Sequence, residues 1–200
     1  MKLRMNEHVR DFEAPVATEA VIRQMNEWIG KEWYFLGLSI DGDVVTTGAE
    51  QALFERLPDV HEVVVLAEHA DVHIPKMMAS VESYVTKMEA LVVGFANALD
   101  RDQIDGAGWE HVETLVSGIE WVVGFIDVVD RSVLELPEWE RVMDIQRPVL
   151  RELSALQGAV TGRHTGMLAL MLREDIVPLF TVVRDVIGEL FETTLQRPKA

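Results

Sequence analysis

One short stretch of the chain concentrates side chains that can bind a metal or transfer protons. Residues 66–73, LAEHADVH, contain Glu68, His69, Asp71 and His73. If this stretch were helical throughout, His69 and His73 would share one face at a spacing of four residues, as the histidines of many metal sites do. The alternative is a polar junction between two secondary-structure elements.

The neighbouring sequence favours the junction. An apolar, β-branched run ends near this stretch, Asp71 is a suitable helix N-cap, and Pro75 suits the first turn of the helix that follows. His69 would then lie outside the helix, so helical spacing would not bring it beside His73. A metal site needs further ligands and the other histidines are isolated, so we expect no metal ion. The candidate ligands for one are His69, His73 and Glu68.

Other signatures of catalysis or cofactor binding are absent from the sequence. It contains no Glu-x-x-His pair of di-iron helices, no glycine-rich phosphate loop and no Gly-x-Ser-x-Gly motif. The lack of cysteine excludes disulfides and thiolate chemistry. Glu174 and Asp175 are adjacent, so on a helix they point about 100° apart and cannot act as a close pair. We expect no cofactor, and the sequence favours a protein that is not an enzyme.

The charge balance limits the partners. The 200 residues carry 34 acidic and 18 basic side chains, a formal net charge of −16. Nucleic acids and anionic membranes bind clustered cations, which this chain lacks. The charged N-terminus does not resemble a signal peptide, and no apolar run reaches the roughly 18 residues that a membrane span requires. We expect a cytoplasmic protein with no nucleic-acid or membrane partner; its protein partner could be basic.

The first third of the chain predicts a small α/β module. Residues 1–16 are charged and are expected to form a flexible arm, with the module itself at residues 17–68. A helix, two strands joined by a tight turn, a short helix and a third strand follow one another, the order αββαβ. The second and third strands should run parallel, with the first strand between them, because a helical crossover joins them.

Short sequence signals predict where these elements begin and end. Thr18 is expected to cap the first helix. Asp41 and Gly42 predict a type I′ turn, in which both central residues need positive φ. Thr47 and Glu50 have the spacing of a capping box. These signals place a hairpin near residue 41 and a short helix directly after residue 47.

From about residue 70 onward the apolar positions follow a helical period. The positions expected to face the core in the first of these helices are Met77, Met78, Val81, Val85, Met88, Leu91, Val92 and Phe95. Pro148 and Pro178 are expected to kink two later helices. Four long antiparallel helices indicate a four-helix bundle over residues 69–200. The predicted fold is α+β, mostly α, with module and bundle as two domains or as one continuous domain.

A glycine-rich segment, GAVTGRHTG, interrupts the helical region. Gly158, Gly162 and Gly166 lie four residues apart, which on a helix would form a strip that another backbone can approach. A loop is the alternative, and it is favoured because glycine costs about 1 kcal/mol in a helix interior. In a loop, Arg163 and His164 would be exposed and able to contact a partner.

Two aromatic residues of the first predicted strand are also candidates for a contact surface. Trp33 and Phe35 alternate with Tyr34 and Leu36, so the two pairs lie on opposite faces of the strand. Trp33 and Phe35 either pack under a helix or form part of an interaction surface, and packing is favoured. The interaction-surface candidates are therefore Trp33, Phe35, Arg163 and His164.

Three segments resemble an uncharacterised group of bacterial proteins. They are YFLGLSIDGDVV, GIEWVVGFIDVV and MLREDIVPLF. The shared features are a hairpin start, a Gly-Ile-x-Trp helix, and a late helix ending in an acidic residue, an aliphatic residue and Pro-Leu. The resemblance implies no activity and no functional residue.

Two functions are compatible with these observations. The first is a non-enzymatic protein-interaction module, such as an adaptor, a chaperone-like protein or an assembly factor. It is supported by acidity, long amphipathic helices and adaptable methionines. The alternative is a helical bundle that binds a metal or a small ligand, an enzyme among the options, centred on His69 and His73. Homo-oligomerisation is compatible with both.

Overall fold

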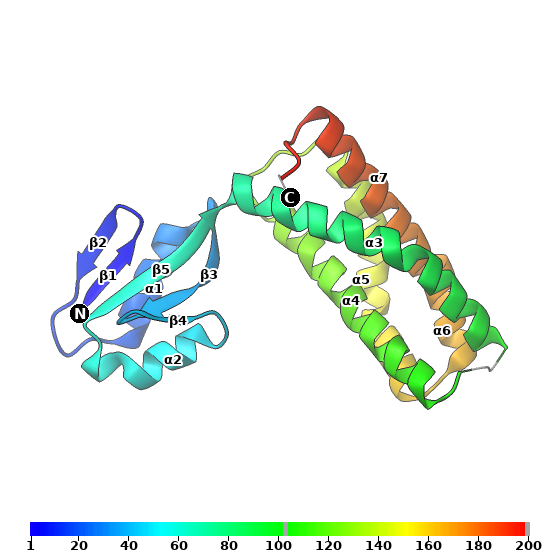
Figure 1. Cartoon of the computed structure of the whole chain (residues 1–200), viewed down its shortest axis with the longest axis horizontal. Coiled ribbons are helices and arrows are strands. Elements are labelled where there is room, and N and C mark those ends of the chain that lie inside the picture. Colours follow the sequence, from blue (N-terminus) through cyan, green and yellow to red (C-terminus); the bar gives the residue numbers. More distant parts are fainter. Residues whose placement is uncertain (102–103, 199–200) are drawn as a thin grey trace. The chain divides into compact units, whose positions relative to one another are not determined.

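The computed structural model describes residues 1–101 and 104–198, without the side chains of residues 58, 107 and 152, and has an α+β fold (Figure 1). The chain divides into two compact units, Met1–His73 and Ile74–Ala200. The first unit contains all the strands of the described chain, and long helices make up most of the second. No helix in the described ranges combines the length and the apolar character that crossing a bilayer requires.

The first unit is built on a five-stranded mixed sheet with the strand order β2-β1-β5-β3-β4. The strands are β1 Lys2–Met5, β2 His8–Asp11, β3 Trp33–Ile40, β4 Asp43–Val45 and β5 Glu62–His69. β3 runs antiparallel to both β4 and β5, and β5 runs parallel to β1. Since β4 and β5 are thus parallel with β3 between them, the predicted arrangement of these three strands is confirmed.

The prediction of a flexible arm over residues 1–16 is wrong, because β1 and β2 form an antiparallel hairpin there. Leu3 and Met5 are buried in the core, whereas the alternate residues Lys2 and Arg4 are exposed. This is the two-residue period of a half-buried strand. The pattern covers only four residues and is surrounded by charged side chains, so the sequence alone does not predict a strand there.

Helices α1 (Thr18–Ile29) and α2 (Ala49–Arg56) cover one face of the sheet and enclose its core (Figure 1). The fully buried side chains in this core include Leu3, Val21, Leu38, Leu53 and Val63. Trp33 and Phe35 pack against the same core and are partly buried. The sheet is therefore apolar toward α1 and α2, as expected for a two-layer arrangement.

Neither helix has the N-cap that the sequence predicts. Ala17 precedes α1 and Thr18 is already its first residue. Gly48 precedes α2 in a left-handed conformation with φ of 65°, and no side chain caps that helix. Because α2 begins two residues after Thr47, the capping box between Thr47 and Glu50 does not form, and the Glu50 carboxylate is left without that role.

The predicted turn at Asp41 and Gly42 is confirmed, with φ values of 48° and 96°. The Asp41 carboxylate accepts hydrogen bonds from the backbone N–H groups of His61 at 3.1 Å and Glu62 at 2.7 Å. The hairpin turn is thereby joined to the beginning of β5, the central strand. These backbone donors lower the pKa of Asp41 because they stabilise its ionised form.

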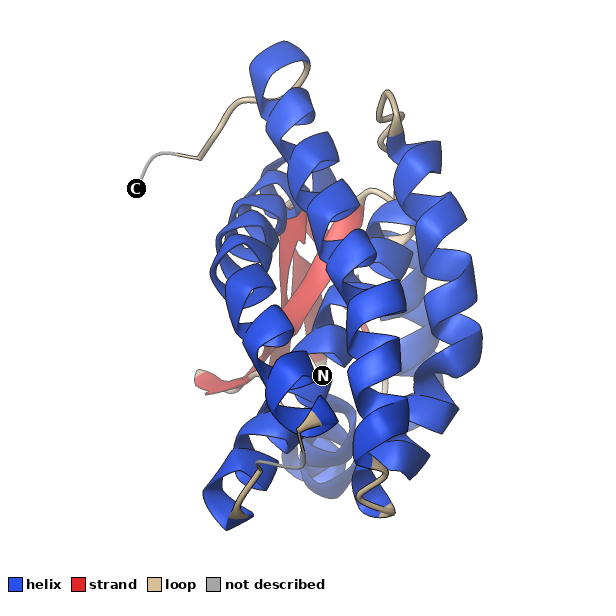
Figure 2. Ribbon diagram, turned by 90° about the vertical axis from the view of Figure 1, so that its right-hand side faces the viewer, coloured by secondary structure: helices blue, strands red, loops and turns tan. Residues whose placement is uncertain are grey.

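The helices of the second unit lie side by side (Figures 1 and 2). They are α3 Ala70–Asp100, whose first four residues belong to the first unit, α4 Gly106–Asp130, α5 Trp139–Thr161, α6 Thr165–Met171 and α7 Val177–Thr193. A π-helical segment, Leu172–Ile176, joins α6 to α7. The kink predicted at Pro178 therefore takes the form of this π-helical segment, one turn before the proline. Pro178 has no backbone N–H and so cannot donate an α-helical hydrogen bond to that turn.

The glycine-rich segment is mostly helical, so the prediction of a loop over residues 158–166 is wrong at both ends. Gly158 lies within α5 and Gly166 within α6. Only residues 162–164 form the connection, where Arg163 has a φ of 52°. A Cβ atom added to Gly158 would meet no atom within 4 Å, so no crowding requires glycine at this position.

Three arginine–carboxylate pairs join α3 to the C-terminal part of the chain. Arg173 lies 2.6 Å from Asp100, Arg184 pairs with Glu89, and Arg197 pairs with Glu82. Residue numbers rise along α3 as they fall along the partner segment, so the two run antiparallel. These six residues are referred to below as the α3–α7 seam.

Replacing Asp41 with asparagine should remove a pH-dependent contribution to the stability of the first unit. The folded pKa of Asp41 lies below the ordinary value of 3.8, so the contribution is complete above that value and is lost as the pH falls through the folded pKa. Urea unfolding followed by NMR signals of β3 and β5, between about pH 2 and about pH 6, should show a smaller acid loss in Asp41→Asn than in the wild type. Asp59→Asn, a nearby exposed carboxylate, is the control; equal acid losses in wild type and Asp41→Asn would contradict the prediction.

Candidate functional site

The four polar residues of residues 66–73 lie where β5 meets α3. His69 Nδ1 is 2.6 Å from an Asp71 carboxylate oxygen, and His73 Nδ1 is 3.0 Å from a Glu68 carboxylate oxygen. β5 continues to His69, and α3 begins at Ala70, so Asp71 lies within the helix and is not its N-cap. The two histidines are thus engaged by different carboxylates.

β3 supplies an aromatic partner for each of these histidines. Trp33 meets the His69 ring edge-on, with 5.1 Å between ring centroids, and Tyr34 stacks on His73 at 3.9 Å. Consecutive strand residues point to opposite faces, so the two pairs are separated by the sheet. Within the described ranges, no group of three or more metal-ligating side chains is assembled. This geometry provides two histidine–carboxylate pairs, each held by an aromatic ring.

The four residues predicted to form an interaction surface are divided between the two units. Trp33 and Phe35 pack on the core of the first unit. In the second unit, the Arg163 guanidinium lies 5.5 Å from the centre of the Trp109 ring, a cation–π contact. His164 is exposed and its ring folds back over Gly162. That these residues contact a partner stays a prediction.

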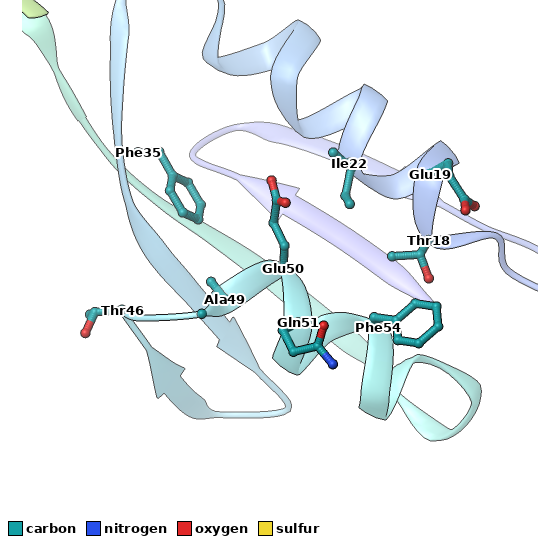
Figure 3. A pocket seen from close by; sticks show the side chains of 10 residues that line it. Thr18, Glu19, Ile22, Phe35, Thr46, Ala49, Glu50, Gln51 and Phe54 are labelled. Atoms are coloured by element: carbon teal, nitrogen blue, oxygen red, sulfur yellow. The ribbon is translucent and has the colours of Figure 1, made fainter.

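A cavity of about 660 Å³ opens in the first unit between α1, β3 and the start of α2 (Figure 3). This α1–α2 pocket is lined by Thr18, Glu19, Ile22, Phe35, Thr46, Gly48, Ala49, Glu50, Gln51 and Phe54. Its lining combines apolar and aromatic walls with two carboxylates. The sequence predicts Glu50 as a helix cap, and for that reason does not identify it as a pocket residue.

A second opening, of about 700 Å³, lies between two helices of the second unit. This α3–α4 groove is lined by Tyr84, Met88, Leu91 and Phe95 of α3 and by His111, Thr114, Leu115, Ser117, Gly118 and Trp121 of α4. Leu91 is 53% exposed and Trp121 is 42% exposed. The groove therefore presents two large apolar side chains to solvent, one from each of its walls.

Tyr84 lies across Gly118 at the floor of the groove. A Cβ atom added to Gly118 would fall 1.6 Å from the Tyr84 hydroxyl oxygen, so the phenol occupies the space of a side chain there. The Tyr84 ring also meets Trp121 edge-on, with 5.5 Å between centroids. Burial raises the pKa of Tyr84, because the phenolate would lose hydration at this position.

The remaining polar groups of the groove are few. His111 stacks on Phe95 with 6.4 Å between ring centroids, and Thr114 and Ser117 donate their hydroxyl protons to backbone carbonyls one turn earlier in α4. These groups are thus oriented within α4 itself. The arrangement is suited to binding apolar side chains rather than to proton transfer.

Helix α4 is acidic, but none of its carboxylates is among the residues that line the groove. Helix α4 contains five carboxylates and no lysine or arginine; they are Glu110, Glu113, Glu120, Asp127 and Asp130. Asp127 pairs with Arg131 at 2.9 Å, and Glu120 accepts a hydrogen bond from Gln157. Glu110 and Glu113 are exposed at the N-terminal end of the helix. Glu113 lines a separate opening with Gln157 and Arg163, so this carboxylate and Glu120 face α5 and not the groove.

The Gly118→Ala variant should be less stable than the wild type. The new methyl group displaces the Tyr84 ring, and overpacking of this kind costs about 1–3 kcal/mol of unfolding free energy. Gly124→Ala is the matched control in the same helix, because its Cβ would meet no atom within 4 Å. It should gain up to about 1 kcal/mol from helix propensity. Thermal unfolding measures both; equal shifts in the two variants would contradict the prediction.

The free energy of unfolding should fall at alkaline pH because Tyr84 ionises. Its folded pKa is raised above the ordinary value of 10.0, so its contribution is complete below that value and is lost as the pH rises through the folded pKa. Urea unfolding of the wild type and of Tyr84→Phe, compared from about pH 8 to about pH 11, should show the steeper alkaline loss in the wild type. Parallel curves would refute this role of Tyr84.

Comparison of the chain with protein-family models, with curated proteins and with solved structures found no match to any of them.

Proposed function

We propose that this protein is a non-enzymatic interaction module that holds an amphipathic helix of a basic partner protein in the α3–α4 groove. The observation that carries the proposal is the opening of about 700 Å³ between α3 and α4, with Leu91 and Trp121 exposed at its edges. Grooves between two helices bind a third helix through apolar residues spaced one turn apart. Aromatic residues such as Trp121 are frequent anchors in such interfaces.

Charge supports a basic partner over an acidic one. α4 carries five carboxylates without a lysine or arginine, and the whole chain has a net charge of −16. Basic residues at the edge of a bound helix would face Glu110, which is exposed and directly precedes the groove residue His111. Such complementarity speeds association and selects orientation more than it adds affinity.

We further infer that the second unit is an antiparallel four-helix bundle in which α6, the π-helical segment and α7 act as one bent helix. The antiparallel pairing of the α3–α7 seam supports this inference. A bundle would hold the groove open without rearrangement and so reduce the entropic cost of binding. We place the protein in the cytoplasm, since a cysteine-free chain suits a reducing compartment.

Titration with a designed helical peptide tests the groove. The probe is a peptide of about 18 residues, or five helical turns, with leucine on one face and lysine on the other; a leucine–glutamate peptide is its counterpart. The leucine–lysine peptide should bind saturably and shift the NMR signals of residues 84–95 and 111–121. Leu91→Asn should weaken binding about tenfold, the loss of about 1.4 kcal/mol from an apolar anchor.

Leu150→Asn is the matched control, because Leu150 lies on α5 and is 46% exposed. It should leave the affinity unchanged. Equal affinities for Leu91→Asn and wild type, or preference for the leucine–glutamate peptide, would reject the proposal. A dimer seen in sedimentation and lost in Leu91→Asn would also reject it, since a second copy of the chain would then occupy the groove.

A further inference from the structure

The α1–α2 pocket has an apolar wall contributed by separate elements. Ile22 comes from α1, Phe35 from β3, and Ala49 and Phe54 from α2. Phe54 is 63% exposed, although it is a large aromatic residue at the entrance. Figure 3 shows Phe35 and Ile22 on either side of Glu50, with the Phe54 ring beside Thr18. At about 660 Å³ the pocket can accommodate a ligand of several non-hydrogen atoms.

Glu50 provides the chemical specificity of this pocket. Its side chain points toward the space between Phe35 and Ile22 (Figure 3). The carboxylate does not cap α2, since Gly48 precedes that helix without any side-chain hydrogen bond. A carboxylate beside aromatic and aliphatic walls is a group that favours a positively charged ligand.

The sign of the charge in the pocket follows from its lining. Glu19 and Glu50 are both among the lining residues, and the lining includes no lysine, arginine or histidine. The first turns of α1 and α2 also border the pocket, and each helix N-terminus contributes roughly half a positive charge. Two full negative charges exceed this, so the pocket as a whole attracts cations.

We propose that the α1–α2 pocket binds a monovalent organic cation, an ammonium or guanidinium group carried on an apolar stem. The stem lies against Phe35, Phe54 and Ile22 while the cation meets Glu50. A lysine or arginine side chain and a free aliphatic amine share this chemistry. The site belongs to the first unit and is independent of the α3–α4 groove, so failure of either proposal leaves the other in place.

NMR titration of the whole chain with small probes tests the site. The probes are 1-pentylamine, the neutral 1-pentanol, the anion pentanoate, and Nα-acetyl-lysine methylamide as a side-chain mimic. Pentylamine should shift the amides of residues 18–22 and 46–54 saturably, and more tightly than pentanol or pentanoate. Binding of the lysine derivative as well assigns the site to polypeptide side chains; binding of pentylamine alone assigns it to free amines.

Glu50→Gln should weaken pentylamine binding about fivefold, the size expected for one partly exposed ion pair. Glu32→Gln, which removes an exposed carboxylate from the same unit, should leave it unchanged. Phe54→Ala alters an exposed side chain and should also weaken binding while the spectrum of the folded protein is retained. Unchanged affinity in Glu50→Gln, equal binding of pentanol, or preference for pentanoate would each overturn the proposal.

Discussion

The close approach of Tyr84 to Gly118 is the constraint on which the α3–α4 groove depends. The phenol occupies the volume that any larger residue at position 118 would need, so α4 can accept this ring only at a glycine. Around the ring, Trp121 and Phe180 make edge-on contacts at 5.5 and 6.1 Å between centroids. The ring of Tyr84 on α3 and the ring of Trp121 on α4 pack edge to face, so they stay in contact across a spacing between the helices that smaller side chains could not span. The floor of the groove is therefore set by the Tyr84 ring, which is itself only partly buried.

The opposite edge of α3 is held by a different kind of interaction. The α3–α7 seam consists of arginine–carboxylate pairs that are partly exposed, such as Arg184 and Glu89. Pairs of this kind contribute little individually, about 0–1 kcal/mol each, but they favour one register of two antiparallel helices over others. Their effect also diminishes as ionic strength rises. α3 is thus fixed in register by charge on one edge and packed by aromatic rings on the other.

Local signals were sufficient to predict some elements of the fold and not others. The Asp41–Gly42 turn depends on two residues that accept positive φ, and the sequence contains both. β1 depends on pairing with β5, and β2 on pairing with β1, more than either depends on its own four residues, so no local pattern predicts them. The sequence does not predict the α3–α4 groove, and the reason is different. Leu91 and Val92 follow the same helical period, yet Leu91 is exposed and Val92 is fully buried. Periodicity identifies the apolar side of a helix but not where a neighbouring helix leaves part of it uncovered.

The positions of the cationic side chains say more about the two openings than the net charge of the chain does. Arg173, Arg184 and Arg197 are engaged with carboxylates of α3, where they join the C-terminal part of the chain to that helix. α4 has no cation of its own, and neither does the lining of the α1–α2 pocket. Neither lining contains a lysine or an arginine, so both openings present apolar surface without a competing cation, and the net charge of −16 supports the two proposed ligands, which are both apolar and basic.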